Sequence, residues 1–267
     1  MPKPLGRHAP RLTEIRSLKT VKGRREHGQF AFEGATLLHE ALAAGVQPES
    51  VYVTPAAFAA TPEVRDLDAS GVDVYTLDES LAAALSDVAT PSGIVAVATM
   101  RIATIPAMLA RAGLLLVLAD LNDPGNAGTL LRSAEAFGAT GVVFGRTGVD
   151  PYHPKVVRAA MGSLFRVPIG IADPEELAAA VAAGGTAVIG LSAEGTPLDR
   201  IAWPERSALV VGHERRGLGR WEIACSVHAG IAMEGSVDSL NAAVAGSIAL
   251  YEAAKKWVRA RSSGACQ

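Results

Sequence analysis

Hydrophobic and polar segments alternate along the second half of the chain. Near-continuous apolar runs, of the kind buried on both faces of a parallel sheet, lie at residues 114–119, 141–144, 187–191, 208–212 and 230–233. Segments that fit amphipathic helices lie between and after these runs, at residues 128–137, 154–161, 174–183 and 239–256. This alternation predicts a parallel α/β sheet, with a ligand site beyond the carboxyl ends of its strands.

The first hundred residues follow a different pattern. Residues 30–45 are predicted to form a helix, because apolar residues between Leu37 and Leu42 recur at spacings of three and four and Gly45 follows them. Short strands are expected at 51–53, 72–77 and 94–99, with helices at 61–70 and 78–85. A connection containing Pro106 follows, so we expect a smaller α/β domain over residues 1–105 and a larger one over 106–267.

Composition places the chain among globular proteins. Of its 267 residues, 49% are hydrophobic and 19% charged, and no window approaches the ~18 uncharged apolar residues of a membrane span. No apolar stretch follows the basic N-terminus as a secretory signal requires, so we expect a cytoplasmic protein. Cys225 and Cys266 are too few for a disulfide framework or a metal cage, and we expect no metal.

Charge is distributed unevenly along the chain. The net charge is −2, but residues 1–28 contain eight Lys or Arg and only two Glu, so the remainder is acidic. A basic segment of this kind suits the phosphate backbone of a nucleic acid. It suits a solvated terminus equally well, and charge alone does not decide between the two.

Three loops that follow predicted strands combine glycine with polar residues, at 120–132, 212–218 and 234–241. Glycine lets a backbone approach a ligand closely while the polar side chains orient it. None of the loops carries GxGxxG or GxxxxGK[ST], which disfavours a dinucleotide-dependent dehydrogenase and a P-loop ATPase.

In chain order these loops resemble the three motifs of the SpoU (TrmH-type) branch of the SPOUT methyltransferases. The motif positions are Asn126 and Arg132 after Asp123-Pro124-Gly125, then Gly212-x-Glu214-x-x-Gly217-Leu218, then Ile231-x-Met233 and Ser239-Leu240-Asn241. The resemblance spans roughly residues 114–257. It implies S-adenosylmethionine as cofactor, methyl transfer to a ribose 2′-hydroxyl of RNA, a trefoil knot in the C-terminal domain and a homodimer.

A second resemblance lies near the N-terminus. The pattern Lys22-x-Arg24-x-x-x-Gly28-x-Phe30-x-x-Glu33-Gly34 is similar to the L30e-like substrate domain of ribosomal RNA methyltransferases of the thiostrepton-resistance type. This similarity favours RNA binding by the basic segment. It implies RNA contacts at Lys22, Arg24, Arg25 and Phe30, with 23S ribosomal RNA as the favoured substrate.

The resemblance also assigns catalytic roles. Arg132 would stabilise the developing alkoxide or act as the base; stabilisation is physically easier, because arginine titrates above ~12. Asn126 would orient Arg132 and the substrate, or simply cap its helix. Glu214 would pair with Arg132 or with an RNA hydroxyl, or be an exposed loop carboxylate. Ser239 and Asn241 would hold the cofactor or a phosphate at the start of the last helix, where Asp238 or Ser239 is alternatively an N-cap.

Cofactor contacts are implied for Leu191, Gly212, Ile231, Met233, Ser239, Leu240 and Asn241, with core packing as the alternative for Ile231 and Leu240. Three residues depart from the family pattern: His213 and Arg215 in the second motif, and Ala232 in place of the usual proline before Met233. We expect His213 to face solvent. Two other functions stay open: a transfer-RNA ribose methyltransferase, and a catalytically silent RNA-binding protein on the same fold.

Overall fold

The chain folds into two compact units. The structure is a computed structural model that describes residues 2–234 and 239–264, with side chains of the last helix described up to residue 255. Unit 1 comprises Met1–Met100 and Tyr152–Phe165, and unit 2 comprises Arg101–Pro151 and Arg166–Gln267. The first segment of unit 1 ends at Met100, whereas the sequence pattern places a boundary after residue 105 and does not indicate that residues 152–165 join unit 1.

Aromatic packing explains why that segment belongs to unit 1. The ring centroid of Phe30 lies 4.6 Å from that of Tyr152, and the rings of Phe32 and Phe165 meet edge to face at 5.1 Å. Pairs of this geometry add to the hydrophobic gain from burying the rings. Two short helices, α9 (Pro154–Ala159) and α10 (Ser163–Arg166), therefore complete unit 1 although a later part of the chain supplies them.

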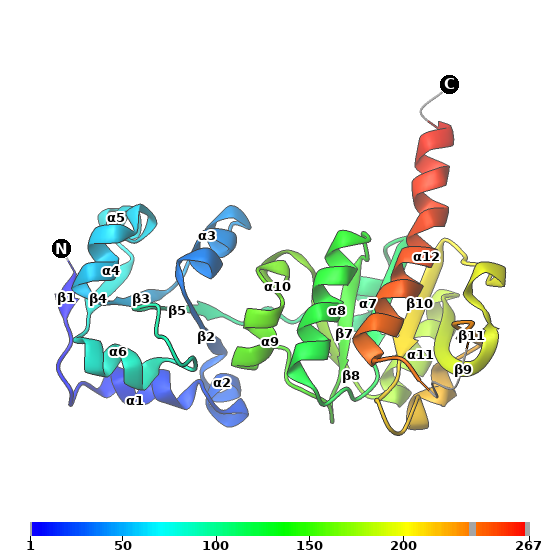
Figure 1. Ribbon diagram of the computed structural model, residues 1–267, viewed down its shortest axis with the longest axis horizontal. Helices are drawn as coiled ribbons and strands as arrows, with labels where there is room; N and C mark the ends of the chain where they lie inside the picture. The colour runs from blue at the N-terminus through cyan, green and yellow to red at the C-terminus, as the bar shows by residue number, and fades with distance from the viewer. Residues whose placement is uncertain (1, 235–238, 265–267) are drawn as a thin grey trace. The chain divides into compact units, whose positions relative to one another are not determined.

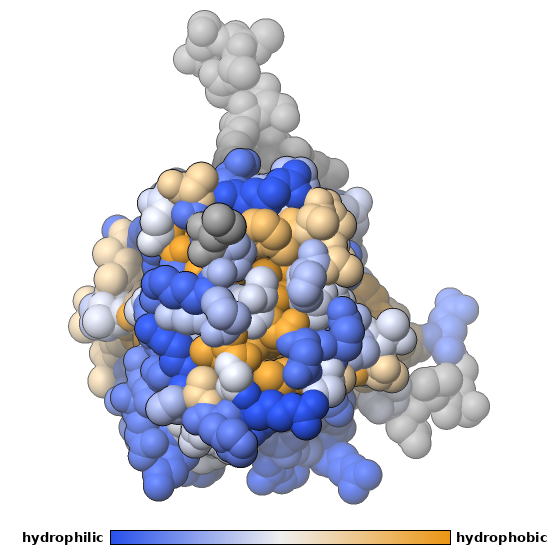
Figure 2. All heavy atoms as spheres, turned by 90° about the vertical axis from the view of Figure 1, so that its left-hand side faces the viewer, coloured by the Kyte–Doolittle hydropathy of each residue, from blue (hydrophilic) through white to orange (hydrophobic). Residues whose placement is uncertain are grey.

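Unit 1 is built on a mixed five-stranded sheet of order β1-β4-β3-β5-β2, in which β1, β4 and β3 are parallel and β5 runs antiparallel to β3 and β2. Its strands are β1 (Lys3–Pro4), β2 (Gln29–Glu33), β3 (Ser50–Val53), β4 (Asp73–Thr76) and β5 (Ile94–Thr99). Its other helices are α1 (Pro10–Ser17), α2 (Val21–His27), α3 (Ala35–Ala43), α4 (Pro55–Ala60), α5 (Pro62–Ala69) and α6 (Glu79–Leu85). Figure 2 looks onto the β1 side of this unit, where hydrophilic residues separate smaller apolar areas.

The start of the predicted helix over residues 30–45 is wrong. Phe30 and Phe32 are buried while Ala31 and Glu33 are partly exposed, which is the two-residue period of a strand, and these residues form β2. Gly34 then adopts φ 102°, and the helix begins only at Ala35. A glycine at this φ separates the two elements, because a residue with a Cβ rarely adopts that conformation.

Unit 2 confirms the predicted parallel α/β architecture. Its six-stranded sheet has the order β11-β9-β10-β6-β7-β8, and every strand pair is parallel (Figure 1). The strands are β6 (Gly113–Leu118), β7 (Gly141–Gly145), β8 (Ile169–Ala172), β9 (Ala187–Pro197), β10 (Arg206–Val211) and β11 (Val227–Gly230). The helices are α7 (Ile105–Leu109), α8 (Pro124–Ala136), α11 (Pro174–Gly184) and α12 (Ala242–Gly264), with 3-10 turns η1 (Leu198–Arg200) and η2 (Gly219–Ala224).

Two strand predictions in unit 2 differ from the structure. Strand β8 was not expected, since only four residues form it and one of them is glycine. The strand expected at 230–233 instead ends at Gly230, and Ile231–Met233 leave the sheet toward α12. Within the described part of the chain, no helix combines the length and apolar character needed to cross a bilayer.

Helices α8 and α12 pack closely against each other and against β10. A Cβ on Gly246 of α12 would lie 2.5 Å from Leu130 Cδ2 and 3.0 Å from Val211 Cγ2. Beside this contact the Ser133 and Ser247 hydroxyls are 2.7 Å apart. Glycine at position 246 therefore allows α12 to lie this close to α8 and β10.

We expect Gly246→Ala to destabilise unit 2 by about 1–3 kcal/mol, because fully buried Leu130 has no room to move away from the added methyl group. Gly184→Ala at the end of α11 is the matched control, since its Cβ would meet only Thr186 Oγ1 at 3.7 Å. Urea unfolding of both variants checks this. Equal or greater stability of Gly246→Ala relative to the control would contradict the packing argument.

Candidate functional site

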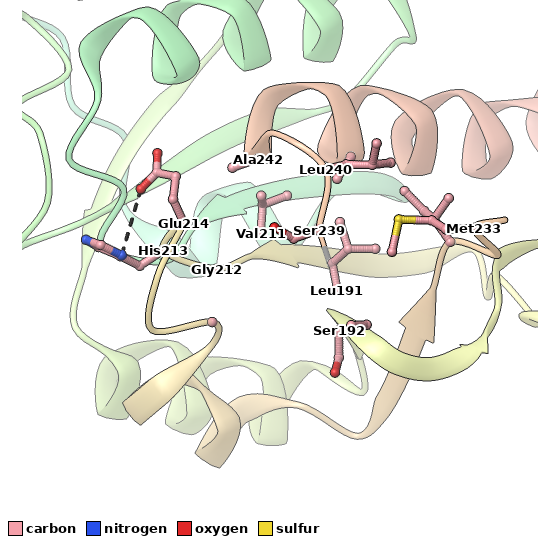
Figure 3. Close-up of a pocket in the computed structure, with 14 residues that line it drawn as sticks. Leu191, Ser192, Val211, Gly212, His213, Glu214, Met233, Ser239, Leu240 and Ala242 are labelled. Carbon is pink, nitrogen blue, oxygen red and sulfur yellow. Dashed lines mark ion pairs between the residues drawn. The ribbon is translucent and has the colours of Figure 1, made fainter. Parts of the chain in front are cut away.

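A pocket of about 130 Å³ lies beside β9 and beyond the carboxyl ends of β10 and β11, with the start of α12 on its other side (Figure 3). Its lining residues are Leu191, Ser192, Ala193, Val211, Gly212, His213, Glu214, Gly217, Ile231, Met233, Ser239, Leu240, Ala242 and Ala245. This is the edge of a parallel sheet at which ligands bind in α/β proteins. The position agrees with the sequence-based expectation.

Most of the described lining residues are small or apolar, and the charge among them is negative. Among the described lining residues Glu214 is the only carboxylate, and neither lysine nor arginine lines the pocket. Phosphate groups in proteins are usually held by basic side chains or helix N-termini. The described lining has no basic side chain, and Asn241 already accepts the Ala243 and Val244 amides at the start of α12, so the lining suits an uncharged or cationic ligand better than a nucleotide phosphate.

The loop after β10 requires glycine at two positions. A Cβ on Gly212 would lie 2.4 Å from the carbonyl carbon of Gly217, and Gly217 itself has φ 61°. The backbone N–H groups of His213 and Gly217 each donate to the other residue's carbonyl oxygen at 2.9 Å. The loop folds back on itself, which places Glu214 at its turn and Gly212 against the pocket.

Asn126 joins the three motif loops through its side chain. Its Nδ2 donates to Glu214 Oε1 at 2.9 Å, and its Oδ1 accepts from Asn241 Nδ2 at 3.0 Å. The amide thus uses a donor toward the second motif and an acceptor toward the third. Asn126 does not cap α8, because Asp123 does so by accepting the Asn126 backbone N–H at 2.7 Å.

Asn241 caps the last helix as well as bonding to Asn126. Its Oδ1 accepts from the backbone N–H of Ala243 at 2.9 Å and of Val244 at 3.2 Å. Ser239, one of the two alternative caps, lines the pocket instead, and Asp238, the other, lies outside the described residues. The side chain that begins α12 is therefore also part of the network around Asn126.

Arg132 does not pair with Glu214 as expected. It lies exposed on α8, six residues after Asn126, and forms no hydrogen bond or ion pair with any residue that the structure describes. Six residues correspond to about 600° of helix rotation, which turns Arg132 roughly 120° away from Asn126. Glu214 bonds to Asn126 instead. No contact among the described residues joins Asn126 to Arg132, so the predicted orientation of Arg132 by Asn126 is not observed.

His213 faces the site rather than solvent, and that expectation is wrong. Its side chain is 14% exposed and its Nδ1 lies 3.8 Å from Glu214 Oε2. Nδ1 accepts the backbone N–H of Arg215 at 3.0 Å, and Nε2 lies 3.1 Å from Asn122 Nδ2. The imidazole therefore connects the loop after β10 with the loop after β6. Its position directly before Glu214 in the second motif was the available signal.

The residues implied as cofactor contacts fall on the pocket with one exception. Those that line it are Leu191, Gly212, Ile231, Met233, Ser239 and Leu240. Asn241 is not among the lining residues and acts through Asn126 and the helix cap. Core packing is not the role of Leu240, which is 37% exposed.

The expected RNA-binding residues separate into two groups. Arg24 is 1% exposed and donates from Nη1 to the Leu18 carbonyl, and Phe30 is 2% exposed among the aromatic rings of unit 1. Side chains buried to this degree do not present a surface to RNA, so the expected RNA contacts at Arg24 and Phe30 are wrong. Lys22 and Arg25 are exposed on α2, with Lys22 3.7 Å from Glu26.

Comparisons with known proteins agree with the class that the three linked motifs define. Residues 113–251 match the SpoU rRNA Methylase family, and residues 9–96 match the MRM3-like substrate binding domain. The chain is 30% identical to the Bacillus subtilis 23S rRNA (guanosine(2553)-2'-O)-methyltransferase RlmP, over 90% of this chain and 94% of that one.

Solved structures give the same result over nearly the whole chain. The AdoMet-bound rRNA methyltransferase from Sinorhizobium meliloti is 28% identical with a TM-score of 0.86, and 95% of this chain and 98% of that one are covered. The SpoU methyltransferase AviRb from Streptomyces viridochromogenes, in complex with AdoMet, is 27% identical with a TM-score of 0.82, at 94% and 99% coverage. The chain belongs to the SpoU rRNA methylase family, which confirms the resemblance seen in its sequence.

Two substitutions at position 241 should separate the helix cap from the link to Asn126. Asn241→Ala removes both and should cost about 1 kcal/mol of stability, whereas Asn241→Asp keeps the acceptor for the Ala243 and Val244 amides, loses only the donor to Asn126 Oδ1, and should cost less. Thermal unfolding of the two variants checks this difference. Equal loss in both would show that the cap contributes little.

Proposed function

We propose that the protein transfers a methyl group from S-adenosylmethionine to a ribose 2′-hydroxyl of 23S ribosomal RNA. The observation that carries the proposal is the bonding of Asn126 to Glu214 and Asn241, which gathers the three motifs of the family beside one pocket. The RlmP relative, named for this reaction on 23S RNA, supports the substrate class. A ribosomal substrate also fits the cytoplasmic location expected from the sequence.

The pocket suits S-adenosylmethionine because most of its lining residues are small or apolar and its described lining is negatively charged. When bound, this cofactor supplies an electrophilic methyl group on a positively charged sulfur, and it carries no phosphate. Gly212 leaves room for close backbone approach, Leu191, Ile231 and Met233 offer apolar contact, and the carboxylate of Glu214 is the only full charge in the described lining. Ser239 adds a hydroxyl that hydrogen-bonds a polar group of the ligand.

Arg132 is assigned to the nucleophile. A neutral 2′-hydroxyl attacks poorly, and a guanidinium beside its oxygen stabilises the negative charge that develops as the hydroxyl proton passes to solvent water. Exposed Arg132, unpaired within the described residues, is available for this role. The hydrogen bond between Asn126 and Glu214 fixes the carboxylate of Glu214 at the pocket, where it orients the incoming ribose.

A homodimer would bring Arg132 to a second subunit's pocket. Helix α12 leaves a stripe exposed, formed by Val244 (49%), Ile248 (37%) and Tyr251 (51%). Apolar stripes of this kind are usually buried against another surface. Ser133, the neighbour of Arg132, contacts Ser247 within the same helix pair, so an interface on this stripe places Arg132 close to it.

Unit 1 is assigned to substrate binding. Its match to the MRM3-like substrate binding domain and the exposed Lys22 and Arg25 support this role. We favour ribosomal RNA over transfer RNA because a whole domain, rather than a short basic extension, precedes the catalytic unit.

Transfer of labelled methyl from S-adenosylmethionine tests the proposal, with unmodified ribosomal RNA and unmodified transfer RNA as separate substrates and nuclease mapping of the product. Label on a ribose of 23S RNA is expected. Label confined to transfer RNA would overturn the proposed substrate. If neither ribosomal RNA, transfer RNA nor assembled ribosomal subunits are labelled, the protein is a catalytically silent RNA-binding protein.

Arg132→Ala should lower the methyl-transfer rate by about 10²–10³-fold or more, because the developing alkoxide loses its counter-charge. Binding of S-adenosylmethionine should be unchanged, since Arg132 does not line the pocket. Arg206→Ala, an exposed arginine at the start of β10, is the control and should be fully active. Single-turnover rates and calorimetric titration measure the two effects. Near-parental transfer by Arg132→Ala would remove it from the mechanism.

Ile248→Glu should convert the dimer to a monomer and abolish methyl transfer, because it places a charge in the middle of the α12 stripe. The matched control is Ile223→Glu on η2, where the isoleucine is 64% exposed and lies outside the stripe. Light scattering during gel filtration gives the molar mass of each variant. A monomeric parent protein, or a dimeric Ile248→Glu, would argue against this interface.

A further inference from the structure

The loop between α6 and β5 is organised around a single carboxylate. Residues 86–93 form neither helix nor strand, and Asp87, Ala89, Thr90, Pro91 and Ser92 are exposed. Burial of apolar side chains therefore does not hold the loop. Glu33, at the end of β2, accepts hydrogen bonds from both ends of it.

The contacts of Glu33 close the loop at its base. Ser86 Oγ lies 2.8 Å from Glu33 Oε1 and 2.9 Å from Oε2, and the Asp87 N–H donates to Oε2 at 3.3 Å. At the other end the Ser92 N–H donates to Oε1 at 3.1 Å, with Ser92 Oγ 3.4 Å from the same oxygen. Hydrogen bonds to a charged acceptor are about twice as strong as neutral ones. The two carboxylate oxygens thus hold residues 86 and 92 together and present residues 88–91.

Lys19 ties the same loop to the basic segment. Its ammonium donates to the Ser86 carbonyl at 3.0 Å and lies 3.2 Å from Asp87 Oδ1. Thr20, the next residue, caps α2 by accepting the Gly23 N–H at 3.0 Å. The helix that carries exposed Lys22 and Arg25 therefore starts beside the loop.

A second cation approaches from α9. Arg158 lines a small hollow of unit 1 together with Glu33 and Asp87. The loop is thus flanked by two cationic side chains, Lys19 in the turn before α2 and Arg158 on α9, and its exposed residues include the hydroxyl-bearing Thr90 and Ser92. Phosphate and ribose oxygens of RNA are bound by donors of these kinds.

We propose that Glu33 is a positioning residue for RNA binding, which holds residues 86–93 in the shape that contacts the RNA backbone between α2 and α9. The inference rests on the proposed function, since it takes RNA as the substrate. Glu33 itself does not touch the RNA. Its role is to fix the loop.

Glu33→Gln distinguishes positioning from simple electrostatics by the sign of its effect. Loss of a negative charge near a polyanion, by itself, strengthens binding. Glutamine, however, has an NH2 donor in place of one oxygen, so either the Asp87 N–H or the Ser92 N–H loses its acceptor and the base of the loop is no longer closed at both ends. Positioning therefore predicts weaker binding where charge alone predicts tighter binding.

The experiment measures the Kd and KM of the full-length protein for 23S RNA, with kcat, S-adenosylmethionine affinity and thermal unfolding recorded for each variant. Glu33→Gln should raise Kd and KM about tenfold, comparable to the loss of one good hydrogen bond, with kcat and cofactor affinity unchanged. Glu63→Gln, which removes a partly exposed carboxylate from α5 of the same unit, is the matched control and should bind RNA as tightly as the parent or more tightly. The double variant Ser86→Ala/Ser92→Ala changes no charge and should weaken binding in the same direction.

Parental or tighter RNA binding by Glu33→Gln with an unchanged unfolding temperature would overturn the inference. If Glu33→Gln lowers the unfolding temperature, the variant Thr90→Glu decides instead. It leaves the Glu33 contacts in place and puts a negative charge at the exposed tip of the loop. Unchanged RNA binding by Thr90→Glu would also overturn the inference. Failure of the parent protein to bind or methylate RNA would instead reject the proposed function, so the two failures are distinguishable.

Discussion

The arrangement of the site depends on the side-chain amide of Asn126. It bonds to Glu214, 88 residues later in the chain, and to Asn241, 115 residues later. An amide suits this position because it offers a donor and an acceptor at once, so one side chain satisfies a carboxylate on one side and another amide on the other. Without it, Glu214 and the start of α12 would lack a common partner.

Glycines allow the backbone to form the walls of the pocket. Gly212 lies against the carbonyl carbon of Gly217 at a distance that excludes a side chain, and Gly246 lets α12 approach α8 and β10. These contacts place the loop after β10 and the first turn of α12 on opposite sides of the pocket (Figure 3). The glycines that allow close packing in unit 2 therefore also determine the shape of the pocket.

Unit 1 uses its basic segment for two purposes. Arg24 is buried in the interior, whereas Lys19 bonds to the 86–93 loop and Lys22 and Arg25 remain exposed. A count of charges treats these residues alike. Position on α2 separates Arg24 from Lys22 and Arg25, because one face of a short helix is buried and the other faces solvent.

The sequence by itself determined the parallel α/β unit, most of its strands and the three motif loops, because buried parallel strands have continuous apolar runs and glycine marks the loops after them. It did not indicate β2, where two alternating phenylalanines precede a helix, or the packing of residues 152–165 into unit 1. Only the tertiary structure decided the partners of individual side chains: Glu214 with Asn126 instead of Arg132, His213 between two loops, and Arg24 inside the fold. These outcomes depend on distances between residues far apart in the chain, which local patterns of polarity do not specify.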